Sequence, residues 1–376
     1  MNHGKNRYTT LDGWPDEQQK LLLQCAFLTE SSQVCHIWEQ WQSHNNRSRI
    51  DHASRTILPI VLQNLLKHGA NIDPALQKNI QKQYFHIYIH NQRLFKQAAK
   101  LIHQLHQAGF KTMVLKGAPL TLQYYNKLGL RFMSDVDILI PTHQALDCIA
   151  FMSKLAWKPV SRKPEKFSVD YVTVSHGHEF HHPDGRKIDL HWHVLHECCR
   201  PDSDIDFWDA AIPINFSGTN TNALNPADQL LHICVHSARF GSSIPLRSLV
   251  DVLIILNQSP IDLDWIRLLS QAKKRKLILP VRETLFYVLK YLNATIPEHI
   301  SKQFQVTSVA KSQQIEYCYK RQDYHHKKLG YFPIMIFDYL RLRYHMGLWE
   351  YLRRFWGTSN KRESLRFLLR TVLKKH

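Results

Sequence analysis

The stretch that decides the fold is KGAPLTLQYYNKLGLRFMSDVDILI, residues 116–140. A short apolar run, residues 113–115, precedes it and is typical of a buried strand. A small-residue turn, a helical segment and a second strand follow, and this strand carries Asp135 and Asp137. Because side chains alternate along a strand, the two aspartates are expected on one face. Neighbouring carboxylates repel each other unless a cation lies between them, so the pattern predicts a hard divalent cation such as Mg²⁺.

The turn at Gly117-Ala118 predicts an anion-binding site next to this metal site. A turn of small residues before a helix exposes backbone N–H groups, and the helix N-terminus adds partial positive charge. A metal site beside a phosphate-binding turn is the combination that binds a nucleoside triphosphate.

A third carboxylate comes from residues 186–195, RKIDLHWHVL. Alternation along this run places Asp189, His191 and His193 on one face and its apolar side chains on the other. The preceding Pro-Asp-Gly turn predicts a hairpin with the strand-like run 169–182.

Three segments, KGAPL, LRFMSDVDILIP and KIDLHW, resemble the uncharacterised nucleotidyltransferase family of the DNA polymerase β-like superfamily. The resemblance covers roughly residues 85–290. It implies that Gly117 and Ala118 form the phosphate-binding turn, that Asp135 and Asp137 bind metal, and that Asp189 is the third carboxylate. Ala118 departs from the family pattern, which has Gly or Ser there.

Three more residues are candidates for nucleotide binding. Arg131 resembles an arginine that recurs in this family, and its guanidinium would hold a triphosphate oxygen or pair with a site carboxylate. Lys116 could do either, although a lysine at a strand end is often only solvated. His191 would orient a metal ligand or contact phosphate.

The composition favours a folded protein with polyanionic partners. The chain has 376 residues, 44% of them hydrophobic, and a net charge of +18. Residues 301–376 hold 16 Lys/Arg and 5 Asp/Glu, so this basic region either binds an anionic acceptor or membrane surface or is simply a solvated helical face. Seven scattered cysteines without a C-x-x-C pair indicate neither a disulfide framework nor a zinc site. We expect a cytoplasmic protein, since no secretory signal or membrane-spanning run is evident.

The chain is expected to divide into four parts around an α+β fold. These are a helical N-terminal region (1–108), a nucleotidyltransferase core with a mixed β-sheet (109–215), a helical region packing on the core (216–300) and a basic helical C-terminal region (301–376). Residues 215–225 are rich in Gly, Thr and Asn and predict a loop, and Asn225-Pro226 predicts a helix start. An apolar stripe in the C-terminal region could lie against a membrane or a partner helix; it comprises Leu340, Tyr344, Leu348, Leu352 and Phe355.

The predicted reaction is transfer of a nucleoside monophosphate from an NTP, with ATP favoured, to a hydroxyl-bearing acceptor with release of pyrophosphate. Asp135 and Asp137 would hold Mg²⁺, and Asp189 would bind a second ion and help to deprotonate the acceptor hydroxyl. The acceptor stays open among a small molecule, a protein and RNA. One alternative is an inactive module that binds nucleotide and RNA or an anionic membrane surface. Another is kinase-like transfer with the same carboxylates.

Overall fold

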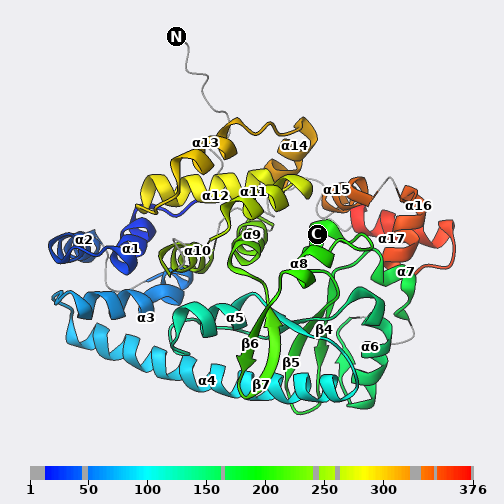
Figure 1. The fold of residues 1–376 in the computed structure, drawn as a ribbon, viewed down its shortest axis with the longest axis horizontal. Coiled ribbons are helices and arrows are strands. Elements are labelled where there is room, and N and C mark those ends of the chain that lie inside the picture. Colours follow the sequence, from blue (N-terminus) through cyan, green and yellow to red (C-terminus); the bar gives the residue numbers. More distant parts are fainter. Residues whose placement is uncertain are drawn as a thin grey trace, which may run out of the picture. The chain divides into compact units, whose positions relative to one another are not determined.

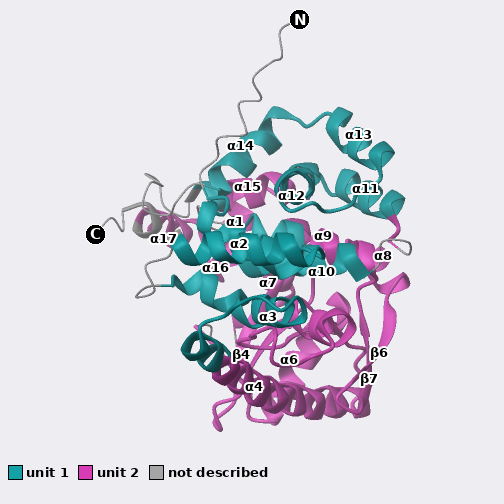
Figure 2. Cartoon of the chain, turned by 90° about the vertical axis from the view of Figure 1, so that its left-hand side faces the viewer, with its two compact units in different colours: residues 1–80, 233–261, 265–334 teal, residues 81–232, 262–264, 335–376 magenta. Residues whose placement is uncertain are grey.

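The computed structural model describes residues 13–44, 50–161, 166–239, 245–258, 263–321, 332–342 and 345–373. The helices and strands are labelled in Figure 1. The chain forms two compact units, which Figure 2 shows in two colours. Unit 1 comprises residues 1–80, 233–261 and 265–334, and unit 2 comprises residues 81–232, 262–264 and 335–376.

Unit 2 contains a mixed seven-stranded sheet in the order β3-β4-β5-β2-β1-β7-β6. The pairs β2–β5 and β1–β7 are parallel, and the other four pairs are antiparallel. The strands are β1 (Met113–Leu115), β2 (Asp137–Leu139), β3 (Lys158–Pro159), β4 (Gly177–His181), β5 (Lys187–His191), β6 (Ile212–Phe216) and β7 (Thr219–Ala223). Together with many helices, this sheet confirms the predicted α+β class.

The long helix α4 (Pro74–Gln107) lies along one face of the sheet (Figure 1). At its start, the Asp73 side chain accepts a hydrogen bond from the Leu76 backbone N–H at 2.9 Å, and Pro74 is the first helical residue. After its end, Gly109 takes a positive φ of 86°, which favours glycine. Buried residues of α4, from Leu94 to Leu105, share one hydrophobic core with the strands, and this packing fixes the sheet against the helix.

The other helical segments of unit 2 before residue 226 are short. They are α5 (Gly117–Leu120), the π-helix η1 (Thr121–Tyr125), the 3-10 helices η2 (Thr142–Gln144) and η4 (His196–Cys198), α6 (Ala145–Lys154), α7 (Val169–Val172) and α8 (Ile205–Asp209).

The predicted hairpin around Pro183-Asp184-Gly185 is confirmed, with β4 and β5 antiparallel on either side of the turn. The prediction that the whole run 169–182 is strand-like is wrong. Its first residues form α7, which Ser168 caps by accepting a hydrogen bond from the Tyr171 backbone N–H. A serine cap therefore overrides the β-branched character of Val169 and Val172.

The prediction of a loop over residues 215–225 is also wrong, because this segment holds the end of β6 and all of β7. Ser217 and Gly218 form the connection with positive φ angles of 49° and 86°. Two central residues with positive φ make the tight turn that joins twisted antiparallel strands. The polar composition concealed a hairpin whose second strand pairs with β1.

The helix start at Asn225-Pro226 is confirmed by α9 (Pro226–Ser237). The Asn225 side-chain oxygen accepts a hydrogen bond from the Asp228 backbone N–H at 3.1 Å. This interaction satisfies one of the unpaired N–H groups of the first helical turn.

The described residues of unit 1 form helices joined by loops, without a strand. Asn64 ties two of its helices together, since its side-chain amide donates to the backbone oxygens of Cys25 and Leu28 at 2.9 Å each. The helices are α1 (Glu17–Phe27), α2 (Ser31–His44), α3 (His52–Lys67), α10 (Leu246–Gln258), α11 (Trp265–Lys274), α12 (Ile278–Tyr291), α13 (Glu298–Val306) and α14 (Lys311–Lys320).

The last part of the chain forms α15 (Phe332–Leu342), α16 (Leu348–Trp356) and α17 (Lys361–Leu373). The single apolar stripe predicted over residues 340–355 is wrong, because α15 and α16 are separate helices; Tyr344 lies outside the described residues. In α16, Arg353 and Arg354 form ion pairs with Asp170 of α7 at 2.9 and 3.3 Å. These two arginines therefore connect elements of unit 2. Within the described part of the chain, no helix is long and apolar enough to cross a membrane.

Candidate active site

The sheet brings Asp137 and Asp189 next to each other. They lie on the parallel strands β2 and β5, and the register pairs them directly. On its other side, Asp137 pairs with Leu115, the last residue of β1. Lys116 follows this residue at once, so three strands deliver two carboxylates and one ammonium group to the same place.

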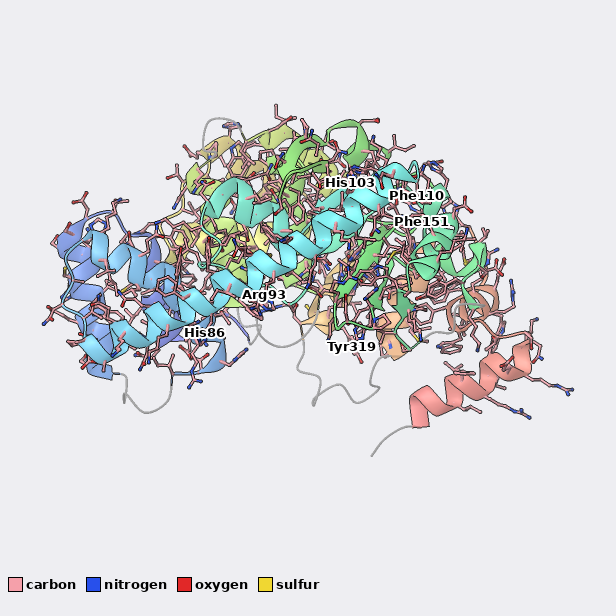
Figure 3. All side chains as sticks on the ribbon, turned by 90° about the horizontal axis from the view of Figure 1, so that it is seen from below. His86, Arg93, His103, Phe110, Phe151 and Tyr319 are labelled. Atoms are coloured by element: carbon pink, nitrogen blue, oxygen red, sulfur yellow. The ribbon has the colours of Figure 1, made fainter. Side chains whose placement is uncertain are left out.

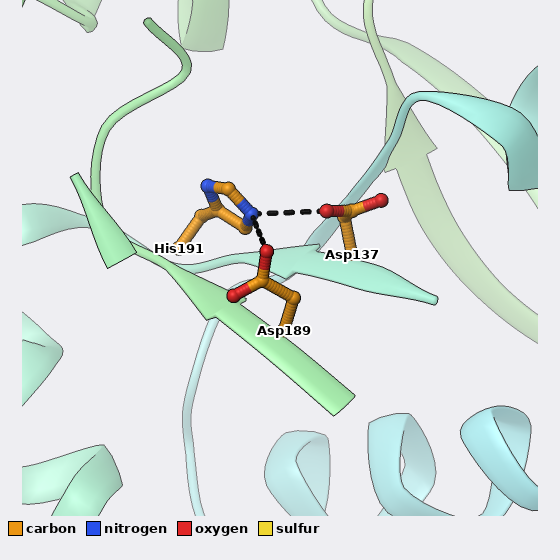
Figure 4. A group of neighbouring side chains, drawn as sticks. All are labelled: Asp137, Asp189 and His191. Carbon is orange, nitrogen blue, oxygen red and sulfur yellow. Dashed lines mark hydrogen bonds and ion pairs between the residues drawn. The ribbon is translucent and has the colours of Figure 1, made fainter. Parts of the chain in front are cut away.

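His191 connects the two carboxylates, as Figure 4 shows. Its Nε2 atom lies 3.0 Å from Asp137 Oδ1 and 2.9 Å from Asp189 Oδ2, and its side chain is fully buried. One ligand atom from each of these three residues lies within 4.8 Å of the others. This buried group could hold a metal ion, and it is the only such group of three or more found among the described residues.

Lys116 supplies positive charge to this cluster. Its Nζ atom donates a hydrogen bond to Asp137 Oδ1 and lies 3.6 Å from Asp189 Oδ2. The residue has φ 54° and ψ −120°, a conformation that L-amino acids rarely adopt. Such backbone strain is often found at functional sites, where the surrounding structure holds it in place.

The protonation states follow from these contacts. Burial opposes the charged form of each group, but the mutual attraction outweighs it. Lys116 and His191 hold the pKa of Asp137 below its usual range, and His191 and Lys116 hold that of Asp189 well below it. The two carboxylates in turn raise the pKa of His191 above its usual value. These shifts favour the charged forms of the two carboxylates and of the His191 imidazole.

Asp135 lies beside this cluster but not within it. The expectation that it belongs to the same strand as Asp137 is wrong, because β2 begins at Asp137. Its carboxylate is half-buried and accepts a hydrogen bond from Ser134 Oγ at 3.1 Å. Burial and the negative charge of Asp137 raise the pKa of Asp135. Its charge is thus less well compensated than that of the other two aspartates.

Gly117 and Ala118 begin helix α5, and both are buried. A Cβ atom on Gly117 would collide with the guanidinium of Arg131 and come within 2.9 Å of Met133 Cγ. Only glycine therefore allows Arg131, which is itself 7% exposed, to pack against this turn. The Ala118 side chain belongs to the hydrophobic core, where a larger side chain would have to displace its neighbours.

Helix α4 holds the loop that leads to Asp135. The fully buried Asn91 donates its side-chain amide to the backbone oxygens of Leu128 and Arg131 at 2.7 and 2.6 Å. His90 Nε2 lies 2.8 Å from the Met133 backbone oxygen. Neither residue can be identified from the sequence, because a polar side chain within an amphipathic helix does not indicate a partner about 40 residues away.

The prediction that His193 shares the face of Asp189 and His191 is wrong, because β5 ends at His191. The buried His193 instead places Nδ1 2.6 Å from Asp204 Oδ2. Both residues line a separate groove of about 700 Å³, together with Thr142 and Trp208.

Residues 52–293 match the family described as uncharacterised nucleotidyltransferase. The chain belongs to this family. Two of the segments that carry the sequence resemblance, LRFMSDVDILIP and KIDLHW, contain Asp137 and Asp189, which the strand register pairs directly.

Among solved structures, the chain is similar to the crystal structure of an antigenic nucleotidyltransferase-like protein from Paracoccidioides brasiliensis. The sequences are 14% identical, the TM-score is 0.34, and the match covers 54% of this chain and 93% of the other. A search of curated proteins finds no match.

Proposed function

We propose that this protein is a magnesium-dependent nucleotidyltransferase that moves a nucleoside monophosphate from an NTP, with ATP favoured, to a hydroxyl-bearing acceptor. The acceptor oxygen would bond to the α-phosphorus, the bond from that phosphorus to the bridging oxygen would break, and pyrophosphate would leave. The observation that carries the proposal is the convergence of Asp137 and Asp189 in a chain of this family. We further propose that it acts in the cytoplasm.

The donor set fits a divalent cation. Asp137, Asp189 and the adjacent Asp135 offer carboxylate oxygens, which Mg²⁺ prefers, whereas a His191 nitrogen would suit a transition metal better. We assign the three aspartates to Mg²⁺ and leave His191 as a hydrogen-bonding partner of the carboxylates. Bound cations would neutralise the triphosphate and stabilise the charge that develops at the α-phosphate.

Residues of the chain would accept the acceptor's proton and bind the phosphates. Asp189 would receive the proton of the acceptor hydroxyl. Because Lys116 and His191 hold the pKa of Asp189 well below its usual range, Asp189 is a weak base in its present contacts. We therefore expect Lys116 to turn from the carboxylates to the phosphates when the nucleotide binds, which would strengthen the base. Arg131 and the backbone of Gly117 and Ala118 would bind the β- and γ-phosphates.

The test is transfer of label from α-labelled ATP to components of a cell extract in the presence of Mg²⁺. We expect the wild type to label an acceptor and the Asp135→Asn/Asp137→Asn variant to lose at least about a hundredfold in rate, since two metal-binding charges are removed. A matched control is Asp202→Asn/Asp209→Asn, which changes two exposed aspartates of unit 2 outside the cluster. Full activity of the Asp135/Asp137 variant would refute the proposal.

One observation favours a second candidate, a module that binds nucleotide without turnover. Lys116 already supplies countercharge that a metal ion would otherwise supply to Asp137. In that case calorimetry would show NTP binding while neither labelled acceptor nor pyrophosphate forms. Release of a nucleoside diphosphate in place of pyrophosphate would instead identify a kinase-like reaction.

A further inference from the structure

The outer face of α4 carries cations and aromatic side chains without any acidic residue. The 34-residue sequence of this helix contains no Asp or Glu. Its buried face packs on the sheet, whereas one exposed stripe recurs every three or four residues and consists of Lys82, Phe85, Ile89, Arg93, Lys96, Lys100 and His103. Figure 3 shows the helix from this side, with His86, Arg93 and His103 labelled along it.

The stripe carries four Lys and Arg residues, namely Lys82, Arg93, Lys96 and Lys100. None of them forms an ion pair with an acidic group in the part of the chain that the structure describes. From Lys82 to Lys100 the stripe extends about 27 Å, at 1.5 Å per helical residue. A straight row of cations of this length suits an extended polyanion better than a small anion.

Exposed aromatic residues near these cations indicate which kind of polyanion would bind. Phe85 is 60% exposed on α4, and Phe132 is 39% exposed on the loop before Asp135. Phe132 stacks against His90 of α4 with the ring centroids 5.1 Å apart. Exposed aromatic rings next to a cationic row are the two elements by which proteins bind single-stranded nucleic acid, since bases stack on the rings and phosphates contact the cations.

The candidate carboxylates lie on the other face of the sheet, because Ile138 and Leu190 pack in one core with α4 and Asp137 and Asp189 alternate with them. The loop that carries Phe132 joins α4 to that site. Phe132 precedes Asp135 by three residues, so their Cα atoms are at most about 11 Å apart. Asn91 and His90 hold this loop on α4. A strand that leaves the stripe beside His90 and Phe132 and follows this loop would bring its end close to the carboxylates.

We propose that the outer face of α4 binds single-stranded RNA and that the hydroxyl-bearing acceptor is an RNA end. The second part of this inference rests on the proposed transferase function, whereas the first does not.

The binding test uses a fluorescein-labelled oligouridine of about 12 nucleotides and fluorescence anisotropy at about 50 to 200 mM salt. With four phosphate contacts, log Kd should rise with log salt at a slope of about 3, since single strands give about 0.7 per contact. Lys96→Gln/Lys100→Gln should reduce this slope by about 1.4. Phe85→Ala should weaken binding about tenfold with little change in slope.

The matched control is Lys361→Gln/Arg362→Gln, which removes two exposed charges from α17. Binding that is lost in this variant and retained in the α4 variant would overturn the inference, as would the absence of binding at low salt. Vesicles of phosphatidylserine and phosphatidylcholine provide a second probe. Binding to these vesicles but not to the oligonucleotide would assign the stripe to a membrane surface and also overturn it.

The acceptor test separates this inference from the proposed function. With α-labelled ATP and a cell extract that contains RNA, protein and small molecules, we expect label on RNA from the wild type and at least tenfold less from the α4 variant. Label on protein or on a small molecule, unchanged in the α4 variant, would refute the RNA acceptor and leave the transferase in place. RNA binding through α4 without any transfer would refute the transferase and leave the binding surface in place.

Discussion

At the scale of single residues, Lys116 decides the electrostatic state of the candidate site. Its ammonium group contacts the buried carboxylate of Asp137 and is itself 23% exposed. Removal of one member of a buried ion pair leaves an uncompensated charge, which is costly, and partial exposure of the lysine reduces that cost. Because a divalent cation would compete for the same oxygens, the effects of Lys116 and of metal on stability should be coupled.

We predict that Lys116→Met lowers the free energy of unfolding by about 1–3 kcal/mol without metal. Addition of Mg²⁺ should then raise its melting temperature more than that of the wild type. Thermal unfolding with and without Mg²⁺ measures both effects. The control is Lys20→Met, which breaks an ion pair with the exposed Glu17 and should cost less than about 1 kcal/mol. Equal responses of Lys116→Met and wild type to Mg²⁺ would contradict the proposed competition.

Part of the candidate site could be predicted from the sequence. Alternation along a strand and spacing within a motif are local properties, so Asp137 and Asp189 could be identified before their pairing was known. The same reasoning misplaced Asp135 and His193, since a strand boundary depends on which neighbours offer hydrogen bonds. Lys116 was open to several interpretations, because the direction of its side chain depends on an unusual backbone conformation of this residue.

At the scale of elements, α4 joins the core to the loop that carries Asp135. Asn91 makes this connection with two short hydrogen bonds to backbone oxygens across the loop. A hydrophobic replacement would leave these carbonyls without their donor in a buried place. The loop should then become less ordered, although the cluster at Asp137 and Asp189 lies on strands and should keep its geometry.

We predict that Asn91→Ala lowers the free energy of unfolding by about 2–4 kcal/mol, because two buried hydrogen bonds and packing are lost. Urea titration measures this effect. Asn79→Ala, at an exposed position of the same helix, should change it by less than about 0.5 kcal/mol. Similar values for the two variants would show that the bonds of Asn91 contribute little.

The hairpin β6–β7 shows why the sequence did not reveal every element. β7 is polar and half-buried, with Thr221 and Ala223 directed inwards, and its composition resembles that of a loop, whereas β6 is mostly apolar. The strand character of β7 comes from its pairing with β1, which is distant in sequence. The tight Ser217-Gly218 connection was the one local signal that could have indicated it.

At the scale of the whole molecule, the chain forms two units, each assembled from segments that are distant in sequence. Larger chains with more than one compact unit often depart from two-state unfolding. Asn64 and Asn91 offer matched probes, since each ties elements within one unit by two hydrogen bonds to backbone oxygens.

We predict that unfolding in urea proceeds in more than one step, and that Asn64→Ala and Asn91→Ala each lower a different midpoint. Hydrogen exchange in unit 1 and unit 2 at intermediate urea concentrations assigns each step to its unit. A single transition that both variants shift alike would show that the units unfold together.

The place of β1 in the sheet has a consequence for synthesis of the protein. Thr112, just before β1, contacts Thr221 of β7 at 2.7 Å, although the two residues are 109 positions apart. At a synthesis rate of about 5–20 residues per second, β1 must wait about 5–20 s for this neighbour. During that time one edge of an apolar strand has no native partner and could pair with another chain. The emerging protein is therefore most prone to aggregate before residue 223 leaves the ribosome, and this is the stage at which a chaperone would be of most use.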